Sequence, residues 1–597
     1  MLGRLYGLLT REERIALLRL LPWVVGAALF EVVGVAAVIP FLSLLADPES
    51  LGRVPLIGPW LAGLEVEPLT LLRWLGLGVA VAVALVNLMM ILTNWRLLRF
   101  SWRLHHAIST RLLRHYLAQR YDFLLHRNSA DLANKVTQEV TRITQDGFGA
   151  GVELIAKSVV ALTIVTFLVA LDPVLAFYAL VSLVGAFALI YLVSKGYLRR
   201  IGREATELNA RRLRIINEAI GGFKELKVTG RESAVMDRYE PPSVRYADIR
   251  AISNAVSLLP RFGLEAIAVG GMVFIASLMA GRSGTFSSTL PLLGAYAFAG
   301  LRLMPALQSI FASLSRFRFA LGAIEAVEED FANAAELRAE LGVADGPRLS
   351  FTRSIELRSV SYRYPGATRP ALQDVSLSIP KRGNVALVGR TGSGKTTLAD
   401  VILGLLPLDD GRIEVDGVSI GPENLLAYRR LFGYVPQSIF LTDGSVKQNV
   451  AFGVADDAID DDAVRRACEA AQLDAFIREE LPEGYDTVVG ERGIRLSGGQ
   501  RQRIGIARAL YYDPPVLIFD EATSALDVHT EKAVYEALGA IAETRTVITI
   551  AHRLETLADA HQVVVMENGR VQDLGPAAEV LARYRQRGAG RTIDATS

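Results

Sequence analysis

The chain has 597 residues, of which 51% are hydrophobic, and its formal net charge is only +1. This length is too great for one domain, and the mean hydropathy of +0.30 is high for a soluble protein. The near-zero charge gives no support for a nucleic-acid partner. The single cysteine, Cys468, excludes an intrachain disulfide and a cysteine-rich zinc site. The first apolar stretch is too long for a cleavable signal peptide, and no peptidase-like domain precedes it.

The amino-terminal half contains a series of apolar runs, each close to or above the about 20 residues that a helix needs to cross the hydrocarbon core. They are Leu20–Ala46, Leu71–Trp95, Val152–Leu171, Pro173–Ser194, Ala255–Ala280 and Leu290–Leu314. A buried helix of a soluble protein rarely stays apolar for so long. The sequence therefore predicts a polytopic α-helical membrane domain over residues 1–319, with six transmembrane helices.

Lysine and arginine distinguish the two sides of this predicted membrane domain. The long segments after the second and fourth runs are rich in both, whereas the loop after the first run has only Arg53 and the loop after the fifth only Arg282. The positive-inside rule therefore places the N-terminus, both long segments and the C-terminal region in the cytoplasm. This predicts a multi-pass protein of the cytoplasmic membrane. Helical patterns at Leu104–Leu117 and Glu204–Ala219 indicate that membrane helices continue into the cytoplasm.

Two segments lie outside this pattern. The outer loop 47–68 is mostly apolar, and it remains open whether it is an interfacial amphipathic helix or a packed loop without a role in transport. Residues 320–350 are polar and rich in Ala and Glu, which predicts a linker. From Ile355 the sequence alternates strands with helices, so we assign 351–585 to an α/β domain and 586–597 to a tail.

The pattern G-x-x-x-x-G-K-[ST] occurs at residues 389–396, after an apolar strand and before a helical segment. This is the context of a phosphate-binding loop, in which backbone N–H groups and a helix N-terminus hold phosphate oxygens. We expect Lys395 to reach the β- and γ-phosphates and the Thr396 hydroxyl to ligate Mg²⁺. The predicted ATP-binding residues of this segment are Gly389, Arg390, Thr391, Gly392, Ser393, Gly394, Lys395, Thr396 and Thr397.

Two carboxylates end another apolar strand, at residues 515–521. A carboxylate at a strand end beside a phosphate loop can hold Mg²⁺, and we assign this role to Asp520. The adjacent Glu521 can act as general base on the attacking water. Catalysis in such a site consists of positioning and charge stabilisation.

A serine and two glycines open a further helical segment, in the sequence Leu-Ser-Gly-Gly-Gln that ends at Gln500, and these residues predict a second anion site. Together with the phosphate loop and the strand that carries Asp520 and Glu521, in this order, they resemble an ATP-binding cassette (ABC) ATPase. The resemblance covers residues 355–580. It implies that Ser497, Gly498, Gly499 and Gln500 contact the ATP bound by a second cassette.

The same resemblance implies roles for several other residues. Tyr364 would stack on adenine, Gln437 would sense Mg²⁺ and the attacking water, and His552 would contact the γ-phosphate. The segment Ser524–Asp527 would cross the dimer seam, and Gly490–Gly493 resembles a segment specific to exporters. One cassette behind six membrane helices looks like a half-transporter of the exporter type, so we expect a homodimer with two active sites, although a heterodimer remains open.

In the exporter family, short coupling helices in the cytoplasmic segments contact the cassettes. By position, these correspond here to Tyr121–Asn134 and Asn217–Thr229. ATP-driven closure of the cassettes would switch the cavity from inward- to outward-facing. The segment Gly221-Gly222-Phe223 is then expected to couple ATP hydrolysis to transport.

Charged residues within the apolar runs are candidates for the substrate path. Glu31, Arg261, Glu265 and Arg302 are of this kind. A cationic cavity suits an anionic head group such as a phosphate or pyrophosphate. The alternative is an internal ion pair, of Arg261 or Arg302 with Glu31 or Glu265.

These residues also carry a closer resemblance, to bacterial flippases of lipid-linked oligosaccharides. The similar segments are Phe30-Glu31, Pro40-Phe41, the apolar outer loop, Pro260-Arg261 with Leu264-Glu265, and Arg302-Leu303-Met304-Pro305. The resemblance implies a polyprenyl-pyrophosphate glycan as substrate, with Arg261 and Arg302 guiding its pyrophosphate. An exporter of another lipid, a drug or a peptide is the alternative. A non-transport ABC ATPase, or a channel regulated by ATP, would be a protein of a different class.

Overall fold

The computed structural model describes residues 2–36, 41, 68–125, 127, 129–171, 173–280, 286–332, 348–490, 496–520, 539–551 and 560–588. The chain divides into two compact units. One comprises Met1–Arg114 with Ala130–Ala334, and the other His115–Ser129 with Ala335–Ser597. Residues 47–67 of the outer loop and the tail from residue 589 lie outside the described residues.

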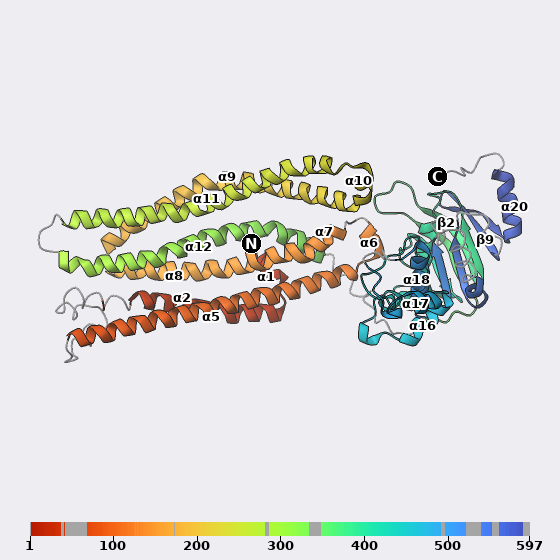
Figure 1. The fold of residues 1–597 in the computed structure, drawn as a ribbon, viewed down its shortest axis with the longest axis horizontal. Coiled ribbons are helices and arrows are strands. Elements are labelled where there is room, and N and C mark those ends of the chain that lie inside the picture. The colour runs from red at the N-terminus through yellow and green to blue at the C-terminus, as the bar shows by residue number, and fades with distance from the viewer. Residues whose placement is uncertain are drawn as a thin grey trace. The chain divides into compact units, whose positions relative to one another are not determined.

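The first unit is helical, and Figure 1 shows long helices lying side by side along it. Five of the predicted apolar runs fall within helices of this unit, and the first run falls within a helix as far as Ala36. Its elements are α1 (Leu2–Leu8), α2 (Arg11–Ala36), α5 (Pro68–Leu117), α7 (Ser129–Asn134), η2 (Lys135–Glu139), η3 (Arg142–Gly149), α8 (Ala150–Leu171), α9 (Pro173–Gly221), α10 (Phe223–Thr229), α11 (Glu232–Ala280) and α12 (Phe286–Ala332).

Several of these helices are far longer than a bilayer requires. Helices α5, α9 and α11 have 50, 49 and 49 residues, whereas about 20 residues cross the hydrocarbon core. The apolar runs therefore continue as helix beyond the length of a span, and the placement of these extensions in the cytoplasm stays a prediction. Among the described residues, Leu69–Leu117 and Leu132–Ala170 are long and apolar enough to span a membrane by length and composition. The number of six spans stays a prediction.

Helix α12 continues to Ala332, so residues 320–332 extend the helix where the sequence indicated a polar linker. The buried side chains Ala320, Ile324 and Val327 recur at helical spacing and give this stretch an apolar face. Lys135 and Asp330 form an ion pair of 2.8 Å beside it, and both side chains are largely buried. Alanine and glutamate favour helix, and one apolar face is enough to pack it.

The second unit contains two β-sheets (Figure 1). The four-stranded sheet is antiparallel in the order β2-β1-β4-β5, and the six-stranded sheet has the order β10-β9-β3-β8-β7-β6. In the larger sheet β9, β3, β8, β7 and β6 are parallel and β10 is antiparallel. The strands are β1 (Ser354–Tyr362), β2 (Leu372–Pro380), β3 (Asn384–Val388), β4 (Asp410–Val415), β5 (Val418–Ser419), β6 (Phe432–Val435), β7 (Val516–Asp520), β8 (Thr546–Ile550), β9 (Gln562–Glu567) and β10 (Arg570–Gly575).

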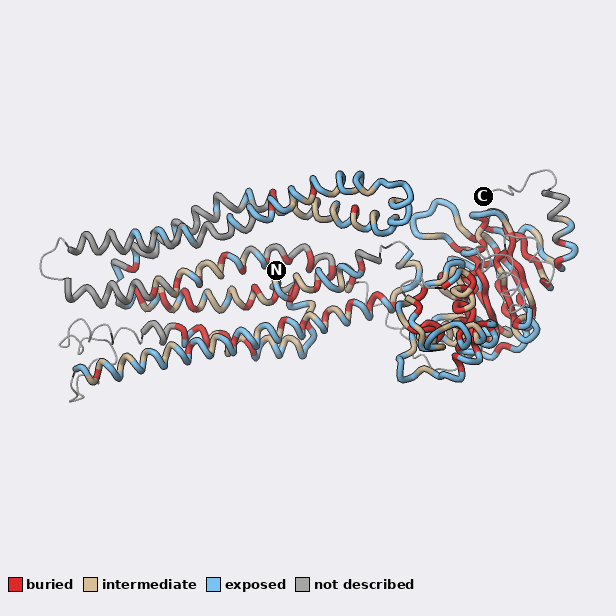
Figure 2. Tube along the Cα trace, viewed as in Figure 1, coloured by how far each residue is buried: buried red, intermediate tan, exposed pale blue. Residues whose placement is uncertain are grey.

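The parallel strands lie in the interior of this unit. All five residues of β7 are buried, as expected for a parallel strand that is covered on both faces. Figure 2 shows the same concentration of buried residues in the strands. The helices are α6 (Tyr121–Leu125), α13 (Lys395–Ile402), α14 (Leu425–Arg429), α15 (Val446–Val450), α16 (Asp461–Ala470), α17 (Asp474–Glu480), α18 (Gly498–Leu510) and α20 (Ala577–Gly588). The predicted α/β domain is confirmed.

Candidate functional site

The phosphate loop joins β3 to α13, and its glycines have backbone conformations that other residues rarely adopt. Gly389, Gly392 and Gly394 have φ angles of 154°, 79° and 102°. A Cβ atom at Gly389 would lie 2.3 Å from the carbonyl oxygen of Met566, and one at Gly394 would lie 2.9 Å from that of Ala371. The fold therefore requires glycine at both positions.

Polar groups converge on this loop. Lys395 is only 5% exposed, and its ammonium group donates hydrogen bonds to the carbonyl oxygens of Gly389, at 2.8 Å, and Arg390, at 3.1 Å. The hydroxyl of Ser393 is buried and has no hydrogen-bond partner within the described protein. A buried hydroxyl without a partner is costly unless a ligand satisfies it. The loop thus fits the phosphates of a nucleotide.

Parallel strands bring the other polar residues to one edge. Asp520 ends β7, Gln437 follows β6, and Thr396 lies in the first turn of α13, after β3. Because carboxyl ends of parallel strands meet at the same edge of a sheet, these side chains belong to one site. Asp520 is 7% exposed, and the Tyr434 hydroxyl donates to its Oδ2 at 3.5 Å. Oxygen ligands of this kind are those that Mg²⁺ prefers.

Asp400 is a member of this region that the sequence analysis did not identify. It lies on α13 and is buried. Burial and the nearby Asp520 raise the pKa of its carboxyl group to about 6. The available signal was an acidic residue between Ala399 and Val401, within an otherwise apolar stretch of the helix.

The segment 115–129 belongs to the same compact unit as the cassette. Burial, followed by the charges of Asp400 and Tyr364, raises the pKa of Tyr121 in α6. Burial and then Asp122 raise the pKa of Tyr362 to about 12. Tyr121 and Asp122, the first residues of the predicted coupling segment 121–134, are therefore close enough to the cassette for these charges to interact, whereas residues 130–134 belong to the other unit.

Tyr364 lies next to the phosphate loop. Its hydroxyl oxygen is 3.1 Å from Oγ1 of Thr397, and its ring meets that of Tyr362 edge-on at 5.0 Å. This position is compatible with a nucleotide contact, and the stacking of Tyr364 on adenine stays a prediction.

Ser497 is the N-cap of α18, and the predicted anion site has a defined local structure. The Ser497 hydroxyl accepts a hydrogen bond from the backbone of Gln500, and the Gln500 side chain accepts one from the backbone of Ser497, at 3.3 and 2.8 Å. This reciprocal arrangement is a capping box. It explains the spacing of serine and glutamine by local helix chemistry, and it leaves Gly498 and Gly499 at the helix N-terminus.

The proposed base Glu521 and the histidine His552 lie outside the described residues, as do Ser524–Asp527 and residues 491–495. Their predicted roles rest on the sequence. The strands that precede Glu521 and His552, β7 and β8, are neighbours in the sheet. Both residues therefore follow strands whose carboxyl ends meet at the edge that carries the phosphate loop.

The membrane unit contains a cluster of three charges. Glu31 on α2 is 5% exposed, and its two carboxylate oxygens lie 3.5 Å from Lys157 on α8 and 3.5 Å from Arg302 on α12. The internal ion pair of Arg302 with Glu31 is therefore present. Arg261 and Glu265 lie on α11, and their side chains are outside the described part of the chain.

Lys157 was missed by the sequence analysis, although it is a lone lysine within the run 152–171. Ala28, Val160 and Leu303, each within one helical turn of a member of this charge cluster, belong to one buried apolar group. With one carboxylate and two cations, the cluster has an excess of positive charge in apolar surroundings.

Comparison with known proteins identifies both units. The family model for the ABC transporter transmembrane region matches residues 36–290, and the model for the ABC transporter ATPase domain matches residues 372–524. The chain is 34% identical to the ATP-dependent lipid A-core flippase of Thiobacillus denitrificans over 77% of this chain and 78% of that one. It is also 34% identical to the flippase of the same name from Cupriavidus pinatubonensis, over 80% and 81% of the two chains.

A solved structure has the same architecture. It is a bacterial Atm1-family ABC exporter with ATP bound, which matches with a TM-score of 0.73 at 25% identity and covers 96% of this chain and 99% of that chain. The match to the transmembrane-region family sets aside a non-transport ATPase. The chain belongs to the ABC transporter family, as an exporter half-transporter that couples ATP hydrolysis to transport.

Proposed function

We propose that two copies of this chain form a flippase that uses ATP to move an anionic, lipid-linked substrate, a polyprenyl-pyrophosphate glycan, across the cytoplasmic membrane. The observation that carries the anionic character is the charge cluster of Glu31, Lys157 and Arg302. Among the described residues, Lys157 and Arg302 share a single carboxylate, so a phosphate group can take the place of Glu31 or bind beside it. Apolar side chains around the cluster strengthen this attraction, because they lower the local dielectric constant.

In the proposed cycle, the loop 389–397 holds the phosphates of ATP, and Tyr364 holds its adenine. Thr396, Gln437 and Asp520 supply the oxygen atoms that would hold Mg²⁺, which neutralises phosphate charge when it is bound. Glu521 orients and deprotonates the attacking water, and His552 donates a hydrogen bond to the γ-phosphate. Ser497, Gly498, Gly499 and Gln500 complete the site of the second copy, which makes hydrolysis depend on the dimer.

The proposed topology places the N-terminus and the cassette in the cytoplasm. It rests on the basic residues that follow the apolar runs 71–95 and 173–194, beginning within α5 and α9. The substrate is then collected from the inner leaflet. The homodimer is supported by a complete set of motif residues in one chain, since no second, catalytically different subunit is needed.

The names of the relatives favour a second candidate substrate, lipid A-core. Both candidates are tested in one experiment, in proteoliposomes that contain either a fluorescent polyprenyl-pyrophosphate glycan or a lipid A-core molecule. Transport is compared between wild type, Glu521→Gln and Arg302→Gln. The matched control is Arg316→Gln, since Arg316 lies on the same helix and pairs with Glu153.

We expect wild type to flip the glycan lipid, Glu521→Gln to stop both hydrolysis and flipping, and Arg302→Gln to reduce flipping with hydrolysis retained. If only the lipid A-core molecule is flipped, lipid A-core is the substrate and the glycan lipid is not. Hydrolysis without movement of either lipid would overturn the proposal.

A further inference from the structure

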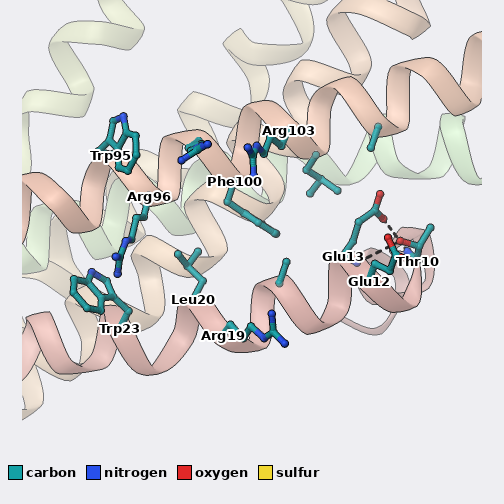
Figure 3. Close-up of a pocket in the computed structure, with 14 residues that line it drawn as sticks. Thr10, Glu12, Glu13, Arg19, Leu20, Trp23, Trp95, Arg96, Phe100 and Arg103 are labelled. Carbon is teal, nitrogen blue, oxygen red and sulfur yellow. Dashed lines mark hydrogen bonds between the residues drawn. The ribbon is translucent and has the colours of Figure 1, made fainter.

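A pocket of about 620 Å³ lies between the N-terminal part of α2 and the middle of α5 (Figure 3), and no residue of the Glu31 cluster lines it. Four arginines line it, one from α2 and three from α5: Arg19, Arg96, Arg99 and Arg103. Within the part of the chain that the structure describes, none of the four forms an ion pair. Within the described residues, their charge is therefore not neutralised by direct ion pairs.

The two acidic residues that line this pocket, Glu12 and Glu13, neutralise little of the positive charge of the four arginines. Glu13 lies 3.6 Å from Arg111, and it also accepts a hydrogen bond from the backbone of Thr10 at 2.8 Å. Glu13 is thus engaged in capping α2 and in pairing with a fifth arginine. Among the residues that line the pocket, Glu12 is then the one acid left to balance the four arginines, so the lining has a clear excess of positive charge.

Two tryptophans make cation–π contacts with two of these four arginines. The guanidinium of Arg96 lies over the ring of Trp23 at 3.8 Å, and that of Arg99 lies 5.2 Å from the ring of Trp95. Trp23 is itself fixed, because its indole N–H donates to the Thr93 hydroxyl at 2.9 Å. Figure 3 shows Trp23 and Arg96 facing one another from the two helices. A guanidinium stacked on an aromatic ring keeps its N–H groups available for a phosphate.

The sequence around the pocket indicates its position relative to the membrane surface. The apolar part of α5 ends at Trp95 and the basic part begins at Arg96, while the apolar part of α2 begins at Leu20. Tryptophans with arginines at the end of an apolar run are typical of the membrane–water interface. Leu88 and Ile91 share the helix face of Trp95 and are 53% and 65% exposed, which leaves an apolar surface beside the pocket.

We propose that this pocket binds the headgroup of an anionic phospholipid from the leaflet on the basic side of the membrane unit. The phosphate contacts Arg96 and Arg99, and an acyl chain lies along Leu88 and Ile91. Basic pockets between membrane helices on this side suit anionic headgroups. This lipid is a resident ligand, distinct from the transported substrate, and the proposal does not depend on which lipid is moved.

The tryptophans provide a local readout. The chain has five tryptophans, so a Trp60→Phe/Trp74→Phe/Trp102→Phe background retains only Trp23 and Trp95. The full chain is reconstituted in phosphatidylcholine vesicles that contain increasing fractions of brominated phosphatidylglycerol or brominated phosphatidylcholine. The ratio of quenching by the two lipids gives the relative affinity, and intrinsic differences in fluorescence cancel.

We expect a preference for phosphatidylglycerol of about fivefold for each contacting arginine. Arg96→Gln/Arg99→Gln should lower it toward one, and high salt should weaken it without any mutation. Arg73→Gln, at the other end of α5, is the control and should keep the preference. Equal quenching by both lipids, an undiminished preference in Arg96→Gln/Arg99→Gln, or indoles that neither lipid reaches would overturn the proposal. The last result would indicate a second copy of the chain over the pocket.

Discussion

Glu31 and Arg302 lie 3.5 Å apart on two helices of the membrane unit, and Lys157 approaches the same carboxylate from a third. Breaking a buried pair leaves charge uncompensated. We therefore expect Glu31→Gln to destabilise the protein by about 3 kcal/mol, because both cations lose their partner. The unfolding temperature in detergent measures this effect.

The double variant Glu31→Gln/Arg302→Gln provides the control for this prediction. In the double variant only one cation, Lys157, lacks a negative partner. Its loss of stability should therefore be smaller than the sum of the losses in the two single variants, by about 1 kcal/mol or more. Strictly additive effects would show that the three charges do not act together.

The capping boxes of α18 and α15 separate helix stability from nucleotide chemistry. Ser445 and Gln448 cap α15 with the same pair of hydrogen bonds as Ser497 and Gln500. Ser445→Ala and Ser497→Ala should each cost about 1 kcal/mol of stability. Only Ser497→Ala should also abolish most of the ATPase activity, since its helix N-terminus is proposed to contact ATP in the second cassette. Equal loss of hydrolysis in both variants would refute that role.

Exposed apolar side chains lie on and beside α10, in the segment that is predicted to couple ATP hydrolysis to transport. Ile220, Phe223 and Val228 are 71%, 58% and 80% exposed, although all are apolar. We expect Phe223→Ala to lower transport per ATP about tenfold, the effect of losing roughly 1.4 kcal/mol of contact energy. Leu213→Ala, on the exposed surface of α9, is the matched control. Normal transport by Phe223→Ala at normal abundance would argue against this contact.

Asp400 predicts a pH effect on the cassette. Its pKa in the folded protein is raised to about 6 from the model-peptide value of 3.8, so the folded state holds a proton that the unfolded state has lost. The free energy of unfolding should therefore fall as the pH rises from about 4 to 6, and stay lower above 6. Asp400→Asn should remove this fall and stabilise the protein by about 1 to 2 kcal/mol above pH 6, allowing for solvent screening.

This pH effect is measured by thermal unfolding between pH 4 and 8 in the presence of a chelator, because a bound cation would favour the ionised carboxylate. Asp457→Asn changes an exposed acid in the same unit and serves as the control. A variant Asp400→Asn with the wild-type pH profile would contradict the proposed origin of the effect.

The sequence by itself determined the family and the order of the two domains, and it predicted the residues of the nucleotide site. Local chemistry explains why these motifs can be recognised: Gly389, Lys395 and Thr396 belong to one loop and the helix start that follows it, and Ser497 and Gln500 belong to one helical turn. The long helices also follow from apolar and basic patterns along the chain. The end of α12 at Ala332 was less evident, because a composition of Ala and Glu suits both a helix and a linker.

The tertiary structure alone decided which distant charges meet. Glu31, Lys157 and Arg302 are separated by more than a hundred residues along the chain, and the sequence left open whether Arg302 pairs within the protein. The approach of Asp400 to Asp520, and of Trp23 to Arg96, likewise joins separate elements. Coulomb and cation–π energies depend on distance through space, and helix packing sets that distance, so no spacing within the sequence could have predicted them.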